Sequence, residues 1–358
     1  MCVNKNLSLI IPMYNASPFI NRCIDSIINQ GIDQDGYEIL IINDGSTDDS
    51  LRKVEKYQNS YPNVRIITQK NQGQSIARNR GIKEAKGRYL WFIDADDFLI
   101  PNSLKKVYES IFVTTQQLKN RTAQEYATCD IITFNVIKGP DKDYNKTQIY
   151  HTTPSYSPIQ KGSEFIVNFP DRFPNGPWWY FIRKEFIDNH GILFHEGKLL
   201  EDGLFIITAL LSADKVGYVS QTLYYYALRP GSTMYTYTPS QLEKINDGFR
   251  NAISYLTNLL EEKKTSIGKA CYDRLIARRN GYVVFLLIRL LKYSHPKYAK
   301  ETLACLKRDN LYPIRNLIGK DYKSWRMKSV HMLINKEWIY LSSCQVYRVI
   351  KACKHYLS

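Results

Sequence analysis

Long apolar runs and paired cysteines are absent from this sequence of 358 residues. The longest apolar stretch, residues 282–288, meets Arg289 well short of the roughly twenty residues that cross a bilayer, so we expect no membrane-spanning helix. Residues 1–6 carry no apolar segment like that of a signal peptide, and we therefore expect a cytoplasmic protein. The seven cysteines are scattered without a CxxC pair, which argues against a zinc knuckle and a disulfide framework.

Net positive charge is nearly absent from the first two thirds of the chain and is concentrated in the last third. Residues 1–120 hold 15 basic and 13 acidic side chains, residues 121–239 hold 11 and 12, and residues 240–358 hold 23 and 9. The last third thus predicts a separate basic surface, whose candidate partners are anionic lipid headgroups and nucleic acid. No basic stripe with interleaved stacking aromatic residues is present, so we expect no nucleic-acid partner.

Apolar strand-like runs alternate with segments of helical spacing over the first half of the chain. The runs are residues 7–11, 39–42, 64–67, 89–93 and 131–136. Alternation of this kind predicts a Rossmann-like α/β domain with a mostly parallel sheet and helices on both faces. The turn after the first run, residues 12–16, lacks the GxGxxG fingerprint, which disfavours a nicotinamide or flavin enzyme.

The remainder of the chain divides into three further stretches. Residues 138–178 are expected to form loops and short strands, and a second patterned block spans residues 178–226. From about Leu242 the pattern is helical, and it ends in an amphipathic segment over residues 336–354 that mixes apolar and basic side chains.

The fourth run ends in three acids, Asp94, Asp96 and Asp97. In an open α/β sheet, ligands bind just beyond the carboxyl ends of the strands, so these acids fall where a ligand would lie. Carboxylates this close repel one another unless a cation lies among them, and oxygen ligands favour Mg²⁺ or Mn²⁺, which accompany phosphates. The alternative is a solvated turn in which an acid caps the next helix.

Polar residues also follow the second and third runs. Ser46 and Asp49 resemble a capping box for the next helix, whereas Asp44 lies before a glycine turn and is placed to accept hydrogen bonds from a base or a ribose. Beyond the third run, Gly73 permits a ligand to approach the backbone at a helix start. Arg78 on that helix is either a ligand contact or a surface cation.

Taken in order, these motifs resemble those of family 2 glycosyltransferases, which are inverting enzymes with the GT-A fold. The similarity covers roughly residues 7–235 and rests on residues 9–15, 41–48, 71–79 and 94–97. It implies a GT-A domain over residues 1–238, with a nucleotide-binding half to about residue 120 and an acceptor-binding half after it, followed by a basic helical region over residues 239–358. The resemblance implies that Asp96 is the ligand of Mn²⁺ or Mg²⁺. It also implies contacts with the nucleotide-sugar for Pro12, Tyr14, Asp44, Arg78 and Asp94.

The same resemblance implies a catalytic base. Glu201-Asp202 is similar to the family's ED motif, whose aspartate removes the proton of the acceptor hydroxyl, although an acid in the first turn of a helix also explains Asp202. Trp178 and Trp179 are either sugar contacts or a buried aromatic pair. Arg229 begins a stretch, residues 229–233, that resembles a loop closing over the diphosphate.

The sequence therefore predicts a metal-dependent glycosyltransferase that moves a sugar from a nucleotide diphosphate-sugar, expected to be a UDP-sugar, to a saccharide or lipid-linked saccharide in surface polysaccharide synthesis. The alternatives are a sugar nucleotidyltransferase and a non-catalytic membrane-surface protein with a degenerate transferase domain. The basic region either grips the anionic inner face of the cell membrane or is a helical cap with solvated cations.

Overall fold

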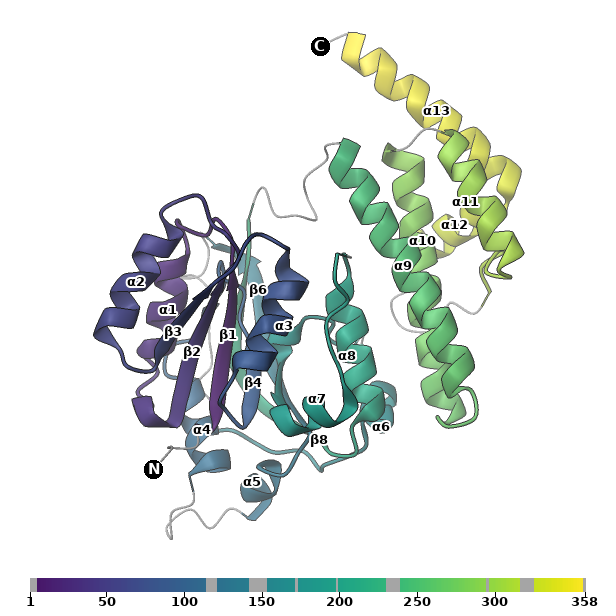
Figure 1. Ribbon diagram of the computed structural model, residues 1–358. Helices are drawn as coiled ribbons and strands as arrows, with labels where there is room; N and C mark the ends of the chain where they lie inside the picture. The colour runs from purple at the N-terminus through teal and green to yellow at the C-terminus, as the bar shows by residue number, and fades with distance from the viewer. Residues whose placement is uncertain are drawn as a thin grey trace. The chain divides into compact units, whose positions relative to one another are not determined.

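The computed structural model describes residues 5–113, 121–141, 153–170, 173–197, 199–229, 239–293, 296–315 and 325–356 (Figure 1). The chain divides into two compact units. The first comprises Met1–Phe165, Pro174–Gly197 and Glu201–Ser232, and the second comprises Ile166–Phe173, Lys198–Leu200 and Thr233–Ser358. The predicted boundary between residues 238 and 239 borders a stretch outside the described residues, 230–238. The division into domains at this point therefore stays a prediction.

The first unit contains an eight-stranded sheet in the order β3-β2-β1-β4-β7-β6-β8-β5. Its strands are β1 (Leu7–Met13), β2 (Tyr37–Asn43), β3 (Val64–Thr68), β4 (Tyr89–Phe92), β5 (Phe98–Leu99), β6 (Ile131–Pro140), β7 (Tyr180–Arg183) and β8 (Val216–Leu228). Strands β1 to β4 are mutually parallel, β7 is antiparallel to β4 and β6, β8 is parallel to β6, and β5 is antiparallel to β8. The predicted mostly parallel α/β sheet is therefore confirmed, with a mixed half added after β4.

Helices cover both faces of this sheet (Figure 1). The helices of the first unit are α1 (Ile20–Ile28), α2 (Ser50–Ser60), α3 (Gln74–Glu84), α4 (Leu104–Phe112), α5 (Arg121–Tyr126), α7 (Lys184–His190) and α8 (Glu201–Ser212), with the 3₁₀ turns η1 (Gln34–Gly36) and η3 (Pro177–Trp179). Helix α6 (Gly162–Asn168) begins in the first unit and ends in the second. Alternate β1 residues such as Leu9 and Ile11 join the core formed with α1, α2 and α4. Ile10 faces α3 instead, where a Cβ on Gly81 would lie 2.3 Å from it. Burial on both faces explains why the strands read as continuous apolar runs.

The expectation for residues 138–178 is partly wrong. Strand β6 runs on to Pro140, and α6 forms where only loops and short strands were expected. Two isolated bridges, at Tyr156 and Gln160, pair this stretch with β8. Long-range pairing with a strand far along the chain is invisible in local periodicity, which accounts for the error.

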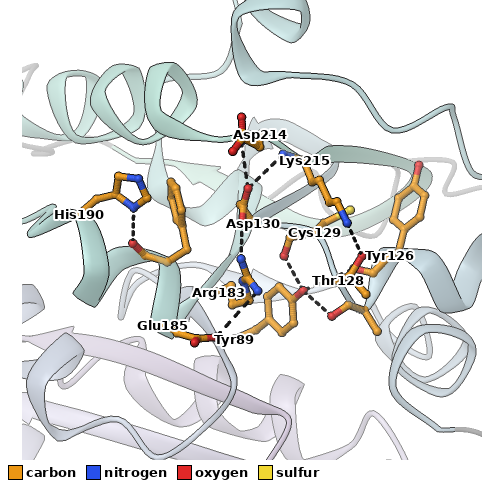
Figure 2. Close-up of polar contacts among 12 residues, drawn as sticks. Tyr89, Tyr126, Thr128, Cys129, Asp130, Arg183, Glu185, His190, Asp214 and Lys215 are labelled. Carbon is orange, nitrogen blue, oxygen red and sulfur yellow. Dashed lines mark hydrogen bonds and ion pairs between the residues drawn. The ribbon is translucent and has the colours of Figure 1, made fainter.

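A polar cluster joins the starts of β6 and β8 to the end of β7, at the edge of the sheet where β4 begins (Figure 2). Asp130 forms an ion pair with Arg183 and accepts the backbone N–H groups of Asp214 and Lys215, each at 3.0 Å. The Tyr89 hydroxyl, at the start of β4, donates to a backbone carbonyl just before β6 at 2.6 Å. The carboxylate of Asp130 is thus fully partnered, which marks this cluster as structural and leaves the other end of β4 for a ligand.

The second unit is helical in its described part. Its helices are α9 (Pro239–Lys263), α10 (Lys269–Tyr293), α11 (Pro296–Arg308), α12 (Trp325–Asn335) and α13 (Glu337–Tyr356). The Tyr340 hydroxyl of α13 donates to a carbonyl of α10 at 2.9 Å, and Phe249 of α9 packs edge-on against Tyr282. The helical pattern expected from about residue 242 is present in these residues. None of the helices in the described ranges is long and apolar enough to span a membrane.

Candidate active site

The three carboxylates that follow β4 lie in three different environments. Asp97 is buried and accepts the Tyr224 hydroxyl at 2.7 Å and the Ala227 N–H at 2.8 Å. Burial raises the pKa of Asp97, and the charges of Asp94 and Asp96 raise it further. The Tyr224 oxygen also accepts the Asp94 N–H at 3.1 Å. Asp97 therefore holds residues 94–97, called the acidic turn below, against β8, and Asp94 and Asp96 remain to bind a ligand.

Arg78 on α3 joins Asp94 to the first two residues of α8. Its Nη2 lies 3.0 Å from Asp94 Oδ1, and its Nη1 lies 3.1 Å from Glu201 Oε1 and 2.6 Å from Asp202 Oδ1. Gln74, one turn earlier on α3, donates to Glu201 Oε1 at 2.6 Å. The Arg78 and Glu201 side chains are buried, whereas those of Asp94 and Asp202 are 24% and 23% exposed. Arg78 is therefore not a surface cation, because its guanidinium gathers three carboxylates at one place.

The charges of this cluster shift one another's proton affinity. Burial lowers the pKa of Arg78, but the carboxylates of Asp202, Asp94 and Glu201 outweigh that effect and hold its pKa above the ordinary value. Burial raises the pKa of Asp202, Arg78 opposes the rise, and Glu201 and Asp94 add to it. Asp202 thus binds a proton more readily than an exposed aspartate, which is the property a general base needs near neutral pH.

Asp96 lies in a second charged group beside the first. Its Oδ2 is 3.1 Å from Nη1 of Arg229, the residue that follows β8, and the Nε of Arg229 is 3.4 Å from Asp141 Oδ2. Asp141 also pairs with Arg22 of α1. The Arg229 guanidinium lies over the Phe19 ring, 3.9 Å from its centroid. The structure therefore brings Arg229 to the acidic turn, while residues 230–233 of the predicted loop lie outside the described residues.

The donor set at Asp96 fits a divalent cation bound together with a diphosphate. Within the described part of the chain, no three His, Cys, Asp or Glu side chains are grouped to hold a metal. Mg²⁺ is commonly held by one or two carboxylates plus water and phosphate oxygens, so a single carboxylate is sufficient. The Asp96 side chain is half-exposed; its partial burial and the charge of Asp94 raise its pKa, whereas Arg229 opposes the rise. A cation would offset this unfavourable negative charge.

Asp44, at the carboxyl end of β2, is held by the loop that precedes α3. Its carboxylate is buried and accepts Gln69 Nε2 at 2.8 Å, the Gln72 N–H at 2.9 Å and the Gly73 N–H at 2.8 Å. Gly73 precedes α3 with φ +94°, a conformation that favours glycine, and no atom lies within 4 Å of where its Cβ would be. Asp44 thus orders this open loop, and its contact with a base or ribose stays a prediction.

The predicted capping box at Ser46 and Asp49 is wrong. Helix α2 begins at Ser50, and the Asp49 side chain makes no cap hydrogen bond. Asp48 takes this role instead, because its Oδ1 accepts the Ser50 N–H at 3.0 Å. The Ser46 hydroxyl accepts the Asn15 N–H at 3.1 Å and so ties the turn after β2 to the turn after β1.

The expected base and sugar contacts differ in exposure. Tyr14 follows β1 and is 52% exposed, whereas Pro12 is half-buried within β1. Trp178 and Trp179 are half-buried in η3. The Trp178 ring stacks on Tyr226 at 5.3 Å, and its buried Nε1 has no hydrogen-bond partner among the residues described. Trp178 is therefore part of an aromatic stack, and its contact with a sugar stays a prediction.

Some residues of the site were not found from the sequence. Arg22 and Asp141 flank Arg229, and Tyr224 positions the acidic turn. Asn79 of α3 exchanges two hydrogen bonds with the backbone of Phe194, at 2.8 and 2.9 Å, in the segment that leads to α8. Asn79 lies in a motif that the sequence had singled out, but Asp141 follows a stretch without periodicity, so no local signal marks it.

Comparison with known proteins agrees with this geometry. Residues 8–115 match the family described as Glycosyl transferase family 2. The chain is 29% identical over 262 residues to the uncharacterized glycosyltransferase EpsJ of Bacillus subtilis (strain 168), covering 70% of this chain and 69% of EpsJ. It is 29% identical over 226 residues to the poly(ribitol-phosphate) beta-glucosyltransferase of Bacillus spizizenii, covering 62% of this chain and 32% of that relative.

Among solved structures, the chain resembles S. aureus TarS 1-349 in complex with UDP-GlcNAc. The TM-score is 0.58 at 18% identity, and the match covers 98% of this chain and 92% of that one. This likeness confirms the predicted GT-A type of fold. The chain thus carries a family 2 glycosyltransferase domain over residues 8–115, and it is an enzyme of the glycosyltransferase class.

Proposed function

We propose that the protein is a metal-dependent, inverting glycosyltransferase that moves a sugar from a UDP-sugar to a saccharide or lipid-linked saccharide in bacterial surface polysaccharide synthesis. The observation that carries this proposal is the placement of Asp94, Glu201 and Asp202 around Arg78, immediately beside Asp96. The UDP-GlcNAc bound in the TarS structure supports a UDP-sugar donor. The poly(ribitol-phosphate) acceptor in the name of one relative supports a surface polymer as the product.

Asp202 is the proposed base. Inverting transfer needs a group that takes the proton of the acceptor hydroxyl while that hydroxyl attacks the anomeric carbon from the face opposite the departing nucleotide. Asp202 combines a raised pKa with a partly exposed carboxylate, so it is both basic enough and reachable. Arg78 holds the carboxylate in one orientation through Oδ1.

The donor is bound by the strand ends around the acidic turn. Asp94 and Arg78 contact the sugar and diphosphate, while Tyr14, Asp44 and Pro12 form the base and ribose site. Asp96 holds Mn²⁺ or Mg²⁺, which when bound supplies positive charge to the departing diphosphate. Glu201 positions Arg78 and Gln74, because its buried carboxylate accepts a hydrogen bond from each of them.

The base assignment is tested with Asp202→Asn. We expect this variant to keep donor binding, measured by calorimetry, and to lose transfer by about a thousandfold or more, since each power of ten is about 1.4 kcal/mol of barrier. Asp188→Asn, at an exposed position of α7, is the matched control and should retain transfer. Transfer at the parental rate by Asp202→Asn would remove Asp202 from its role.

The donor and metal are identified with a panel of nucleotide sugars. Wild-type protein should hydrolyse UDP-sugars slowly in Mn²⁺ or Mg²⁺ and be stabilised by them against heat, and a chelator should abolish both effects. Full turnover in chelator would refute metal dependence. Equal stabilisation by every nucleotide base would refute the choice of uridine.

We also propose that the basic helical region binds an anionic membrane surface. Trp325, Met332 and Trp338 of α12 and α13 are 73%, 61% and 72% exposed, and Lys328 on α12 and Lys336 between the two helices are exposed as well. Exposed tryptophan with lysine is typical of helices that lie at a lipid headgroup layer. The full chain should float with anionic vesicles and not with neutral ones, and Trp338→Ser should weaken flotation. Equal recovery with both vesicle types would refute the proposal.

A further inference from the structure

Arg229 is a buried cation whose hydrogen-bonding capacity is unused. Its side chain is 10% exposed, and it lies within ion-pair distance of Asp96 and Asp141. None of its three guanidinium nitrogens makes a well-aligned hydrogen bond within the described residues. Buried N–H groups without an acceptor are unfavourable, and a guanidinium offers five of them in a planar fork. Arg229 is therefore suited to an additional oxygen ligand.

The surroundings of Arg229 fix its position and leave its charge incompletely balanced. The Phe19 ring covers one face of the guanidinium at 3.9 Å. Asp141, its second partner, is also paired with Arg22, which in turn donates to the Asp96 backbone carbonyl at 3.4 Å. Two arginines thus share Asp141, so Asp96 is the main counter-charge of Arg229.

A divalent cation on Asp96 and the guanidinium of Arg229 are competitors for the same carboxylate. Both are positive, and placing them on one carboxylate brings like charges within a few ångströms of each other. A diphosphate relieves this conflict, because it brings negative charge and phosphate oxygens that match the geometry of a guanidinium. Cation and diphosphate should therefore bind together more strongly than either binds alone.

We propose that Arg229 is the exchangeable counter-ion of Asp96. Arg229 pairs with Asp96 until that carboxylate takes up a divalent cation, and it then donates its N–H groups to the diphosphate of the donor. This inference rests on the proposed function, because it takes Asp96 as the metal ligand. It adds a specific consequence, which is that Arg229 weakens the binding of the metal alone and strengthens the binding of the metal with a nucleotide diphosphate.

The test consists of two binding measurements on the full chain. The first measures the binding of Mn²⁺ alone by electron paramagnetic resonance of the free ion, and the second measures the binding of UDP in saturating Mn²⁺. Arg229→Gln should bind Mn²⁺ alone about tenfold more tightly, because a competing positive charge is gone. The same variant should bind UDP in Mn²⁺ about tenfold more weakly. Arg229→Lys keeps the charge without the fork, so it should bind Mn²⁺ as wild type does and still bind UDP more weakly.

Opposite shifts from one substitution exclude general damage to the fold, and Arg52→Gln, an exposed arginine on α2, should show neither shift. Unchanged or weaker Mn²⁺ binding by Arg229→Gln overturns the inference. Asp96→Asn separates this outcome from failure of the proposed function. If Asp96→Asn abolishes Mn²⁺ binding while Arg229→Gln leaves it unchanged, only the inference fails, and if Asp96→Asn binds Mn²⁺ as wild type does, the metal assignment fails with it.

Discussion

Replacing Arg78 with glutamine should destabilise the protein severely, because it removes the one cation that three carboxylates share. The Arg78 and Glu201 side chains are 2% and 1% exposed, so Glu201 would keep a buried negative charge without a positively charged partner. Breaking a buried ion pair from one side typically costs about 3–5 kcal/mol. For a domain of this size, about 2–4 °C of melting temperature is lost per kcal/mol, which predicts a fall of roughly 10 °C.

The loss of stability in Arg78→Gln should depend on pH in a defined direction. Arg78 opposes the raised pKa of Asp202, so without Arg78 the folded state binds a proton at Asp202 still more readily than the unfolded state does, and lowering the pH favours the folded variant. The deficit relative to wild type should therefore be largest above neutral pH and shrink in acid. Urea unfolding at several pH values measures it, and Arg78→Gln combined with Glu201→Gln should recover part of the loss.

Arg80→Gln is the matched control, since Arg80 lies on the same helix in an exposed pair with Glu84. Its effect should stay within about 0.5 kcal/mol. A loss below about 1 kcal/mol for Arg78→Gln, or a deficit that does not change with pH, would refute the view that Arg78 compensates the carboxylates of α8 and β4.

Three further predictions follow from the residues around this cluster. Tyr224→Phe should lower the free energy of unfolding by about 1–3 kcal/mol in urea titrations, because buried Asp97 loses its hydroxyl donor; a value near zero would contradict that role. Gly45→Ala should cost about 1–3 kcal/mol by calorimetry, since φ is +71° there and the added Cβ would lie 2.8 Å from the Asn71 nitrogen; unchanged melting would refute it. Wild-type transfer should fall as the pH drops through the raised pKa of Asp202, because the base must be ionised; a pH-independent rate would contradict this.

The linkage of Asp202 to folding has the opposite sign to its effect on activity. Its folded-state pKa lies above the unfolded value, so it contributes stability at low pH that is lost as the pH rises toward the folded-state pKa. Activity, by contrast, needs the ionised carboxylate and increases over the same pH window. The enzyme therefore keeps an unfavourable charge at the position where the chemistry requires a base.

Local patterns predicted the parallel half of the sheet well, because β1 to β4 are buried on both faces and read as continuous apolar runs. They did not predict that Arg78 contacts Asp202, since these residues are 124 positions apart and only the packing of α8 beside β4 brings them together. Asp48 rather than Ser46 caps α2, because it is the acid placed to reach the Ser50 N–H.

The residues around Asp96 show where sequence reasoning stops. The acidic turn was recognisable from its position after an apolar run, but its partners Arg22, Asp141 and Arg229 come from α1 and from the ends of β6 and β8. Arg229 begins a stretch that resembles a loop of the family, whereas Arg22 and Asp141 are ordinary charged residues in their own segments. Their common location depends on the order of the mixed half of the sheet, which carries no local signal.

The central claim, that Asp96 binds a divalent cation together with a nucleotide diphosphate, is tested most directly by titrating UDP into the wild-type protein and into Asp96→Asn by calorimetry, with Mn²⁺ and with chelator. We predict that wild type binds UDP only in the presence of Mn²⁺ and that Asp96→Asn does not bind it in either condition. Equal binding of UDP by both proteins, or by wild type in chelator, would contradict the account.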